Sequence, residues 1–148
     1  MYSIVKFKIS DKEHTQLAFD IRNAVFVKEQ NVDPNIEIDC NEASAFHYLA
    51  YEKNIPVGAA RWRFTLDGVK LERFAVVKSY RGKGVGTAIL HAVLEDIDKS
   101  KMVYLHSQIQ SISFYEKNGF AIFREEVIDI GNGFVMDDFV MRKSLLAL

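Results

Sequence analysis

Three glycines alternate with other residues between a predicted strand and a predicted helix, in the segment Arg81-Gly82-Lys83-Gly84-Val85-Gly86-Thr87. Glycine has no Cβ, so it adopts left-handed backbone conformations and lets other groups approach the main chain closely. The first turn of a helix also has free N–H groups and a partial positive charge. A strand end that leads through such a turn into a helix can hold a phosphate or a diphosphate.

Two well-known phosphate-binding loops do not fit this segment. A P-loop requires G-x-x-x-x-G-K-[ST], but Gly84 stands after Lys83 where Ser or Thr is needed. A dinucleotide-binding loop requires G-x-G-x-x-G, but Thr87 stands at the position of the third glycine. The glycines alone are equally compatible with a tight turn that only caps a helix, because short glycine patterns recur by chance.

The chain has 148 residues, and 49% of them are hydrophobic, which predicts one globular domain over residues 1–148. Its 19 basic and 20 acidic side chains nearly balance, which argues against a nucleic-acid partner. Cys40 is the only cysteine, so we expect no internal disulfide, and no Cys/His cluster with metal-binding spacing is present. Residues 1–8 are too short an apolar run and too interrupted by lysines to predict a signal peptide, and no apolar run of about 20 residues is found. We therefore expect a cytoplasmic protein with no membrane partner and no metal.

Hydrophobic periodicity predicts an α+β fold with one central, mixed but mostly antiparallel sheet flanked by helices. Ser10 and Glu13 form a capping-box pattern that predicts a helix from Ser10 to about Gln30, followed by an irregular acidic segment over 31–44. Two further helices are predicted from Val85 to about 97 and over 111–118. The helix between the strands at 69–77 and 102–108 is the usual crossover between parallel neighbours. The predicted strands are 5–9, 46–52, 56–65, 69–77, 102–108, 120–130 and 134–143.

The glycine segment fits the pattern R-x-x-G-x-G from Arg81 to Gly86, which resembles the diphosphate-binding signature of the GNAT-type N-acetyltransferases. The segment 71–77 resembles the fourth strand of that family, and 114–120 resembles its F-Y-x-x-x-G-F segment. The resemblance implies the GNAT acyltransferase fold. A weaker resemblance to the small bacterial ElaA-type branch rests on Arg22, 25–27, 29–30, the pair Glu37 and Asp39, and His47.

The resemblance implies an N-acetyltransferase that moves an acetyl group from acetyl-CoA to a primary amine by direct transfer in a ternary complex. The acceptor is then a small-molecule amine or an amine of a peptide or protein, and a homodimer is a further expectation. The alternative is a non-catalytic coenzyme A binding or regulatory module on the same fold.

By the same resemblance, main-chain N–H groups of 82–87 hold the diphosphate. The backbone of 74–76 pairs with the pantetheine arm, whose amides resemble a peptide and can add to an open strand edge. That pairing requires the strands at 69–77 and 102–108 to diverge. The implied cofactor-binding residues are Phe74, Ala75, Val76, Arg81, Gly82, Lys83, Gly84, Val85, Gly86, Thr87, Gln108, Ser111 and Phe114.

Tyr115 and Glu72 are the candidate catalytic residues. Tyr115 stands where the family commonly places a tyrosine that protonates the leaving thiolate, and its alternative role is aromatic packing or positioning. Glu72 is the candidate base for the amine, and its alternative is a solvated carboxylate paired with a lysine. Regular alternation would place Glu72, Phe74 and Val76 on one face of their strand. The N–H of Val76 is a candidate for polarising the thioester carbonyl.

The acceptor pocket is expected to include Arg22, Glu29, Glu37 and Asp39, because the first helix and the loop after it usually cover that pocket in the family. His47 is expected among the substrate-binding residues too, and it is an alternative candidate base. The alternatives are a solvated charged face for the charged residues and a structural hydrogen bond for His47. The acidic segment over 29–42 favours a cationic small amine or a lysine side chain as acceptor. The spacing of His14, His91 and His106 indicates no site.

Overall fold

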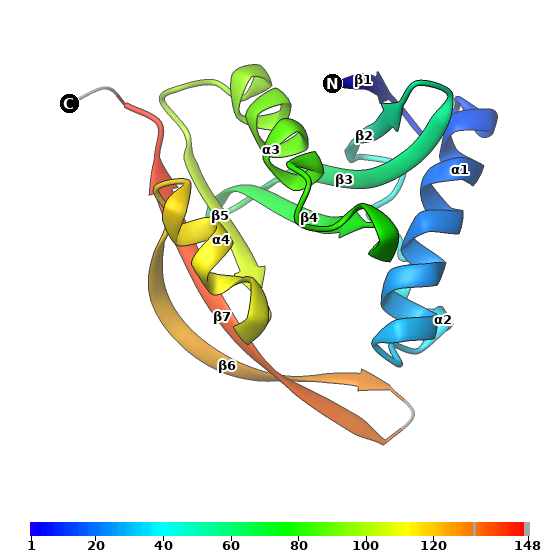
Figure 1. The fold of residues 1–148 in the computed structure, drawn as a ribbon. Coiled ribbons are helices and arrows are strands. Elements are labelled where there is room, and N and C mark those ends of the chain that lie inside the picture. The colour runs from blue at the N-terminus through cyan, green and yellow to red at the C-terminus, as the bar shows by residue number, and fades with distance from the viewer. Residues whose placement is uncertain (132, 147–148) are drawn as a thin grey trace.

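The computed structural model describes residues 1–131 and 133–146, and seven strands in this part of the chain form one sheet in the order β1-β2-β3-β4-β5-β7-β6 (Figure 1). Neighbouring strands are antiparallel, except that β4 and β5 are parallel as predicted. The predicted α+β fold is therefore confirmed. The strands are β1 (Tyr2–Phe7), β2 (Phe46–Glu52), β3 (Ile55–Thr65), β4 (Gly68–Val76), β5 (Met102–Ser107), β6 (Ala121–Gly131) and β7 (Phe134–Ser144).

The helices differ from the predictions mainly near the N-terminus. The N-cap of the first helix is Asp11, not Ser10: a turn brings the Asp11 N–H onto Lys8 O, and the Asp11 side chain then accepts from the N–H of His14. The helix runs on into a π-helical segment, and the segment predicted as irregular contains a short helix that starts at a proline. The helical segments are α1 (Lys12–Arg22), η1 (Asn23–Glu29), α2 (Pro34–Glu37), η2 (Lys78–Tyr80), α3 (Val85–Asp96), η3 (Ile109–Ser111) and α4 (Ile112–Lys117).

The two long helices cover opposite faces of the sheet. On one face, Ile89 and Val93 of α3 are fully buried against β2, β3 and β4. The contact is close, because a Cβ on Gly58 of β3 would lie 2.7 Å from Ile89 Cδ1. On the other face, Ala18 and Ile21 of α1 pack in a second apolar cluster with residues of β2, β3 and β4. None of the helices within the described residues combines the length and hydrophobicity that a membrane crossing needs.

A β-bulge interrupts β4 at Arg73, which has a left-handed φ of 56°. The pairing with β3 shifts there: Ala75 is opposite Ala59 and Glu72 is opposite Arg61, so β4 carries one extra residue between these pairs. A bulge of this kind reverses the side-chain alternation. Phe74 therefore packs on the α3 face, while Glu72 reaches charged groups on the α1 face. The prediction that Glu72, Phe74 and Val76 share a face was wrong, because it assumed a regular strand.

The parallel strands β4 and β5 diverge beyond a short paired stretch (Figure 1). Their pairing runs only from Val69 opposite Val103 to Leu71 opposite Leu105. Both strands continue, to Val76 in β4 and Ser107 in β5, without further pairing to each other. An unpaired edge of β4 is therefore present beside the glycine turn, as the family resemblance implies.

Candidate functional site

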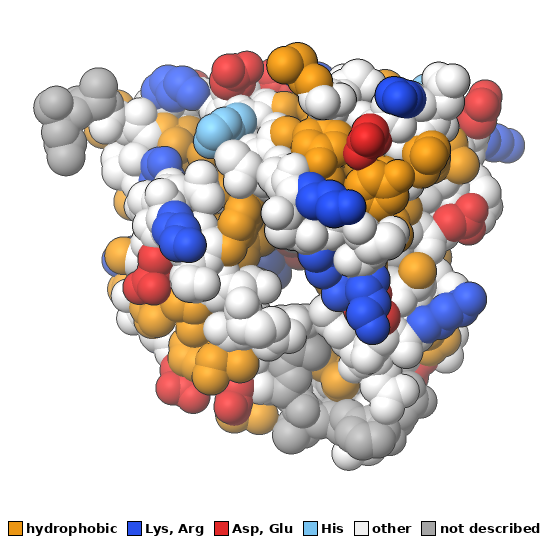
Figure 2. Space-filling model, in the orientation of Figure 1, with side chains coloured by type: hydrophobic (Ala, Val, Ile, Leu, Met, Phe, Trp, Pro, Cys, Tyr) orange, Lys and Arg blue, Asp and Glu red, His pale blue; other side chains and the backbone are white. Residues whose placement is uncertain are grey.

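Two adjoining cavities lie beside the unpaired part of β4, and Figure 2 shows this face of the molecule hollowed near its centre. The glycine-turn cavity, of about 530 Å³, is bounded by the unpaired edge of β4, the turn at 81–87 and α4. The hairpin cavity, of about 410 Å³, is bounded by η1, β4, β5 and residues 128–130 of β6. The residues that line both are Gln30, Phe74, Gln108, Ser111 and Tyr115.

The glycine turn presents main-chain N–H groups that donate to no other group of the described residues. Among the hydrogen bonds of residues 1–131 and 133–146, none has an N–H of 82–87 as donor. Gly82 and Gly84 have left-handed φ values of 73° and 85°, and a Cβ at either would meet no atom within 4 Å. The Tyr2 hydroxyl donates to Lys83 O at 2.7 Å and fixes the turn to β1. Unused donors at a helix N-terminus form a site suited to an anion.

The unpaired edge of β4 carries a second set of backbone groups. Val77 N donates to Val57 O of β3 at 3.0 Å. Since backbone groups alternate between the two edges of a strand, the N–H of Val76 faces the unpaired edge. Phe114 of α4 closes the opposite side, with Cζ 3.3 Å from where a Cβ of Gly86 would lie. All predicted cofactor-binding residues except Lys83 line the glycine-turn cavity.

Arg81 lines the glycine-turn cavity and links β4 to Glu29. Its Nε donates to Val76 O at 3.0 Å, and its two terminal nitrogens donate to the carboxylate of Glu29 at 2.8 and 2.9 Å. Glu29 is thus held beside the glycine turn and lines neither cavity, although it was predicted in the acceptor pocket.

Tyr115 lies where the two cavities meet, and only 7% of it is exposed. Its ring contacts Phe74, Phe114 and Phe120 edge to face, so the predicted aromatic packing is present. Its hydroxyl has no hydrogen-bond partner within the described part of the chain. Burial raises the pKa of this hydroxyl above its usual value, which keeps it protonated.

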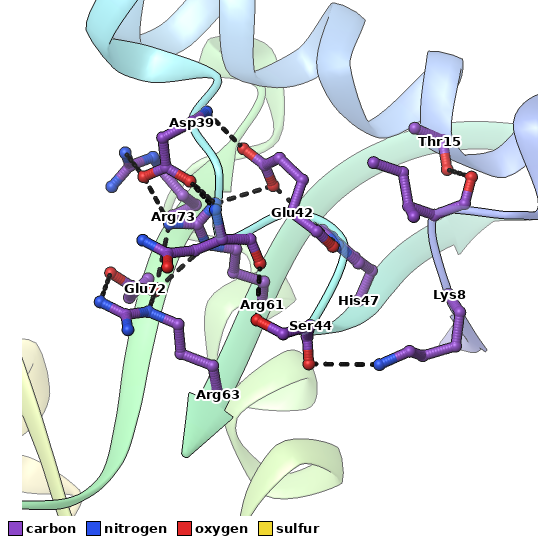
Figure 3. A network of polar contacts seen from close by, with 12 residues as sticks. Lys8, Thr15, Asp39, Glu42, Ser44, His47, Arg61, Arg63, Glu72 and Arg73 are labelled. Carbon is purple, nitrogen blue, oxygen red and sulfur yellow. Dashed lines mark hydrogen bonds and ion pairs between the residues drawn. The ribbon is translucent and has the colours of Figure 1, made fainter. Parts of the chain in front are cut away.

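Glu72 lines the hairpin cavity but is enclosed by cations (Figure 3). Its carboxylate contacts Arg63 at 2.7 Å, Arg61 at 3.1 Å and Lys70 at 3.3 Å. Burial acts to raise its pKa, but the hydrogen bond from Arg63 and the charges of Arg61 and Lys70 hold that pKa below its usual value. A carboxylate held in its ionised form by three cations is a weak base.

Arg22 and His47 line neither cavity, although both were predicted in the acceptor pocket. Arg22 is 1% exposed and donates to the carboxylates of Glu37 and Glu42. The Nε2 of His47 is 2.9 Å from Glu42 O, and the His47 ring stacks on Phe7. Both side chains therefore support the loop that carries α2.

Four of the five acids of the 29–42 segment contact arginines, and the fifth, Asp33, accepts from the N–H of Asn35 as the N-cap of α2. Glu37 does line the hairpin cavity, but its carboxylate contacts Arg22 and Arg73, each at 2.8 Å. Asp39 pairs with Arg61 and Arg73. The four acids paired with arginines therefore offer no free carboxylate to the cationic amine that was expected, and Asp33 lines neither cavity.

His106 and Asp138 form a pair in the hairpin cavity that the sequence did not reveal. His106 Nδ1 lies 2.5 Å from Asp138 Oδ2. The two residues are 32 positions apart and meet because β5 pairs with β7, where His106 is opposite Val140. Only a correct pairing of these strands could have shown the contact.

Comparison with known proteins gives one consistent result. Residues 10–143 match the family model described as an acetyltransferase (GNAT) domain. The uncharacterized N-acetyltransferase YjcF of Bacillus subtilis is 41% identical over 125 residues, which cover 82% of this chain and 89% of that protein. This chain is also similar to the crystal structure of Escherichia coli ElaA, with 27% sequence identity and a TM-score of 0.82. The match covers 97% of this chain and 99% of ElaA. Arabidopsis thaliana Naa50, solved in complex with the bisubstrate analogue CoA-Ac-MVNAL, is 29% identical with a TM-score of 0.70, covering 96% and 99%.

Proposed function

Because this chain belongs to the GNAT family of acetyltransferases, we propose that it moves an acetyl group from acetyl-CoA to a primary amine directly, with both substrates bound. The family shows the chain to be an acyltransferase. The observation that carries the finer proposal is the unused N–H groups of 82–87 next to the unpaired edge of β4. The similar Naa50 structure holds a bisubstrate analogue, which supports direct transfer.

The glycine-turn cavity fits coenzyme A in two ways. The N–H groups of 82–87 would bind the diphosphate, and Arg81 would add positive charge after exchanging Glu29 for phosphate. The pantetheine arm would pair as a strand with the edge at 74–76, with Gln108, Ser111 and Phe114 on its other side. The thioester then lies near Tyr115, where the two cavities join.

Tyr115 supplies the proton for the leaving group in this proposal. The neutral amine attacks the thioester carbon, the carbon–sulfur bond breaks, and the sulfur takes a proton from the Tyr115 hydroxyl. The raised pKa of Tyr115 keeps this proton available at neutral pH. The N–H of Val76 points to the edge where it can polarise the carbonyl oxygen.

The hairpin cavity would hold the acceptor amine. Its volume of about 410 Å³ suits a small molecule or one side chain of a peptide or protein. We also place the reaction in the cytoplasm, since the exposed thiol of Cys40 suits a reducing compartment.

The Tyr115→Phe variant tests the proposal. We expect its turnover, followed as coenzyme A release over a panel of amines, to fall by about 10²-fold or more, because a general acid is lost. Its acetyl-CoA affinity by calorimetry should stay within about twofold, since the ring packing is kept. Tyr51→Phe is the matched control, because Tyr51 lines neither cavity.

Two results would contradict the proposal. An equal loss of affinity and turnover would make Tyr115 a binding residue. If the wild-type protein binds acetyl-CoA but transfers acetyl to none of the amines tested, the chain is a non-catalytic coenzyme A binding module.

A further inference from the structure

We propose that His106, held by Asp138, is the general base that takes the proton from the acceptor amine. The inference rests on the proposed acetyl transfer and assigns the step that Glu72 is poorly placed to perform. Histidine is the side chain that exchanges protons near neutral pH. A histidine oriented by a carboxylate is a recurrent arrangement for proton abstraction.

The hydrogen bond to Asp138 defines the ring nitrogen that is available. A carboxylate oxygen accepts a hydrogen bond, so Nδ1 of His106 carries the hydrogen and Nε2 carries the lone pair. No atom of the described residues bonds to Nε2. Asp138 is 3% exposed and fixed in β7, whereas about a quarter of the His106 side chain is accessible. The pair thus has a rigid support and a reachable base.

His106 also stands where the acetyl group would arrive. The last pair between β4 and β5 is Leu71 with Leu105, so Glu72 and His106 are the first residues beyond it. Leu71 and Leu105 point into the α3-side core, so Glu72 and His106 point to the opposite face. Both line the hairpin cavity, together with Tyr115. The base and the acid would therefore meet the thioester from one cavity.

The environments of the two candidate bases differ. Glu72 shares its oxygens among three cations and cannot accept a proton without losing those contacts. His106 contacts carboxylates instead, with Asp138 bound to its Nδ1 and Glu126 3.9 Å away. The charged and titratable groups around His106 are Asp138, Glu126 at 3.9 Å, Glu72, Lys70 and Tyr104.

The proton balance is complete without another reactant. A protonated amine gives one proton to Nε2, which makes His106 an imidazolium and the amine neutral. The neutral amine forms the new carbon–nitrogen bond, the carbon–sulfur bond breaks, and the sulfur takes the proton of Tyr115. The amide product releases its extra proton, and solvent returns His106 and Tyr115 to their starting forms.

Comparing two acceptor amines shows whether His106 acts as a base or only supports the structure. An alkylamine is protonated at neutral pH and needs a base, whereas an arylamine is already neutral. We expect His106→Gln to lower kcat/KM for the alkylamine by about 10²-fold and for the arylamine by less than about threefold. The residual alkylamine rate should rise about tenfold per pH unit from pH 7 to 9, because only the neutral amine reacts.

Asp138→Asn tests the role of the carboxylate that holds His106, and His91→Gln is the matched control. The amide of the asparagine can donate to Nδ1 and leave the hydrogen on Nε2, so we expect Asp138→Asn to lower the alkylamine rate at least tenfold. His91 is exposed on α3, and His91→Gln should change neither rate. An unchanged melting shift with acetyl-CoA shows that each variant is folded and binds the cofactor.

Three outcomes would overturn the assignment. Equal losses for both acceptors would make the pair structural, and an unchanged alkylamine rate would remove His106 from the reaction. Loss of wild-type activity on adding EDTA would make His106, Glu126 and Asp138 metal ligands instead, since their ligand atoms lie within 4.8 Å of one another. These outcomes can be told apart from a failure of the proposed acetyl transfer itself, because the wild-type protein would then acetylate neither amine.

Discussion

Replacing Gly84 with alanine separates backbone strain from cofactor binding. Gly84 is the N-cap of α3, with φ 85° and ψ 6°, and a Cβ there would meet no atom within 4 Å. The variant therefore suffers no clash but must hold a left-handed conformation, which costs about 1–2 kcal/mol for a non-glycine residue. Gly133 in the β6–β7 turn gives a matched control, since its φ is 79° and its Cβ would also be free.

Both variants should lose similar stability but differ in cofactor affinity. The free energy of unfolding in urea should fall by about 1–2 kcal/mol in Gly84→Ala and in Gly133→Ala. Of these two glycines only Gly84 lines the glycine-turn cavity, where the diphosphate would lie against the N–H groups and where an added methyl group would compete with it. Losing one hydrogen bond to a charged group costs about 1.5–3 kcal/mol, so Kd for acetyl-CoA should rise about 10- to 100-fold.

Calorimetric titration with acetyl-CoA measures this difference directly. Gly133→Ala should bind like the wild type. The reasoning is refuted if Gly84→Ala binds acetyl-CoA within about twofold of Gly133→Ala, because the turn would then not contact the diphosphate.

Three further changes test the fold around the site. Burial acts to raise the pKa values of Asp39 and Glu42, but contacts with arginines outweigh it and lower them to about 2, from 3.8 and 4.5. These carboxylates therefore stabilise the fold above about pH 4.5. Urea titrations should show that this stability is lost as the pH falls toward 2. Arg61→Met leaves those carboxylates without their shared partner and should lower the free energy of unfolding by about 3–5 kcal/mol, a loss that unchanged urea midpoints would disprove. Gly58→Val should lower the free energy of unfolding by about 1–3 kcal/mol, because its Cβ would lie 2.7 Å from Ile89 Cδ1. A melting temperature equal to that of the wild type would show instead that α3 shifts to accommodate the side chain.

Elements with a clear local signal could be predicted from the sequence. The strand at Phe46–Glu52 and the start of α3 at Val85 lie where alternation and the glycine turn place them. The parallel pairing of β4 and β5 followed from the helix between them. The glycine turn indicated an anion site because that chemistry needs only neighbouring residues.

Features that depend on pairing between distant segments could not be predicted. The bulge at Arg73 adds a residue relative to β3, and arginine has no preference for a left-handed φ that would mark it. A solvent-exposed charged face was the alternative prediction for Arg22 and Glu37. Both are buried, and their ion pair neutralises the two charges. The contact of His106 with β7 likewise depends on the strand order.

A crystal structure with acetyl-CoA is the most direct test of the site. We expect the diphosphate within hydrogen-bond distance of main-chain N–H groups of 82–87, the pantetheine arm along 74–76, and the thioester sulfur beside the Tyr115 hydroxyl. A coenzyme bound elsewhere, with those N–H groups uncontacted and the edge of β4 still open, would contradict the proposed site and the reaction built on it.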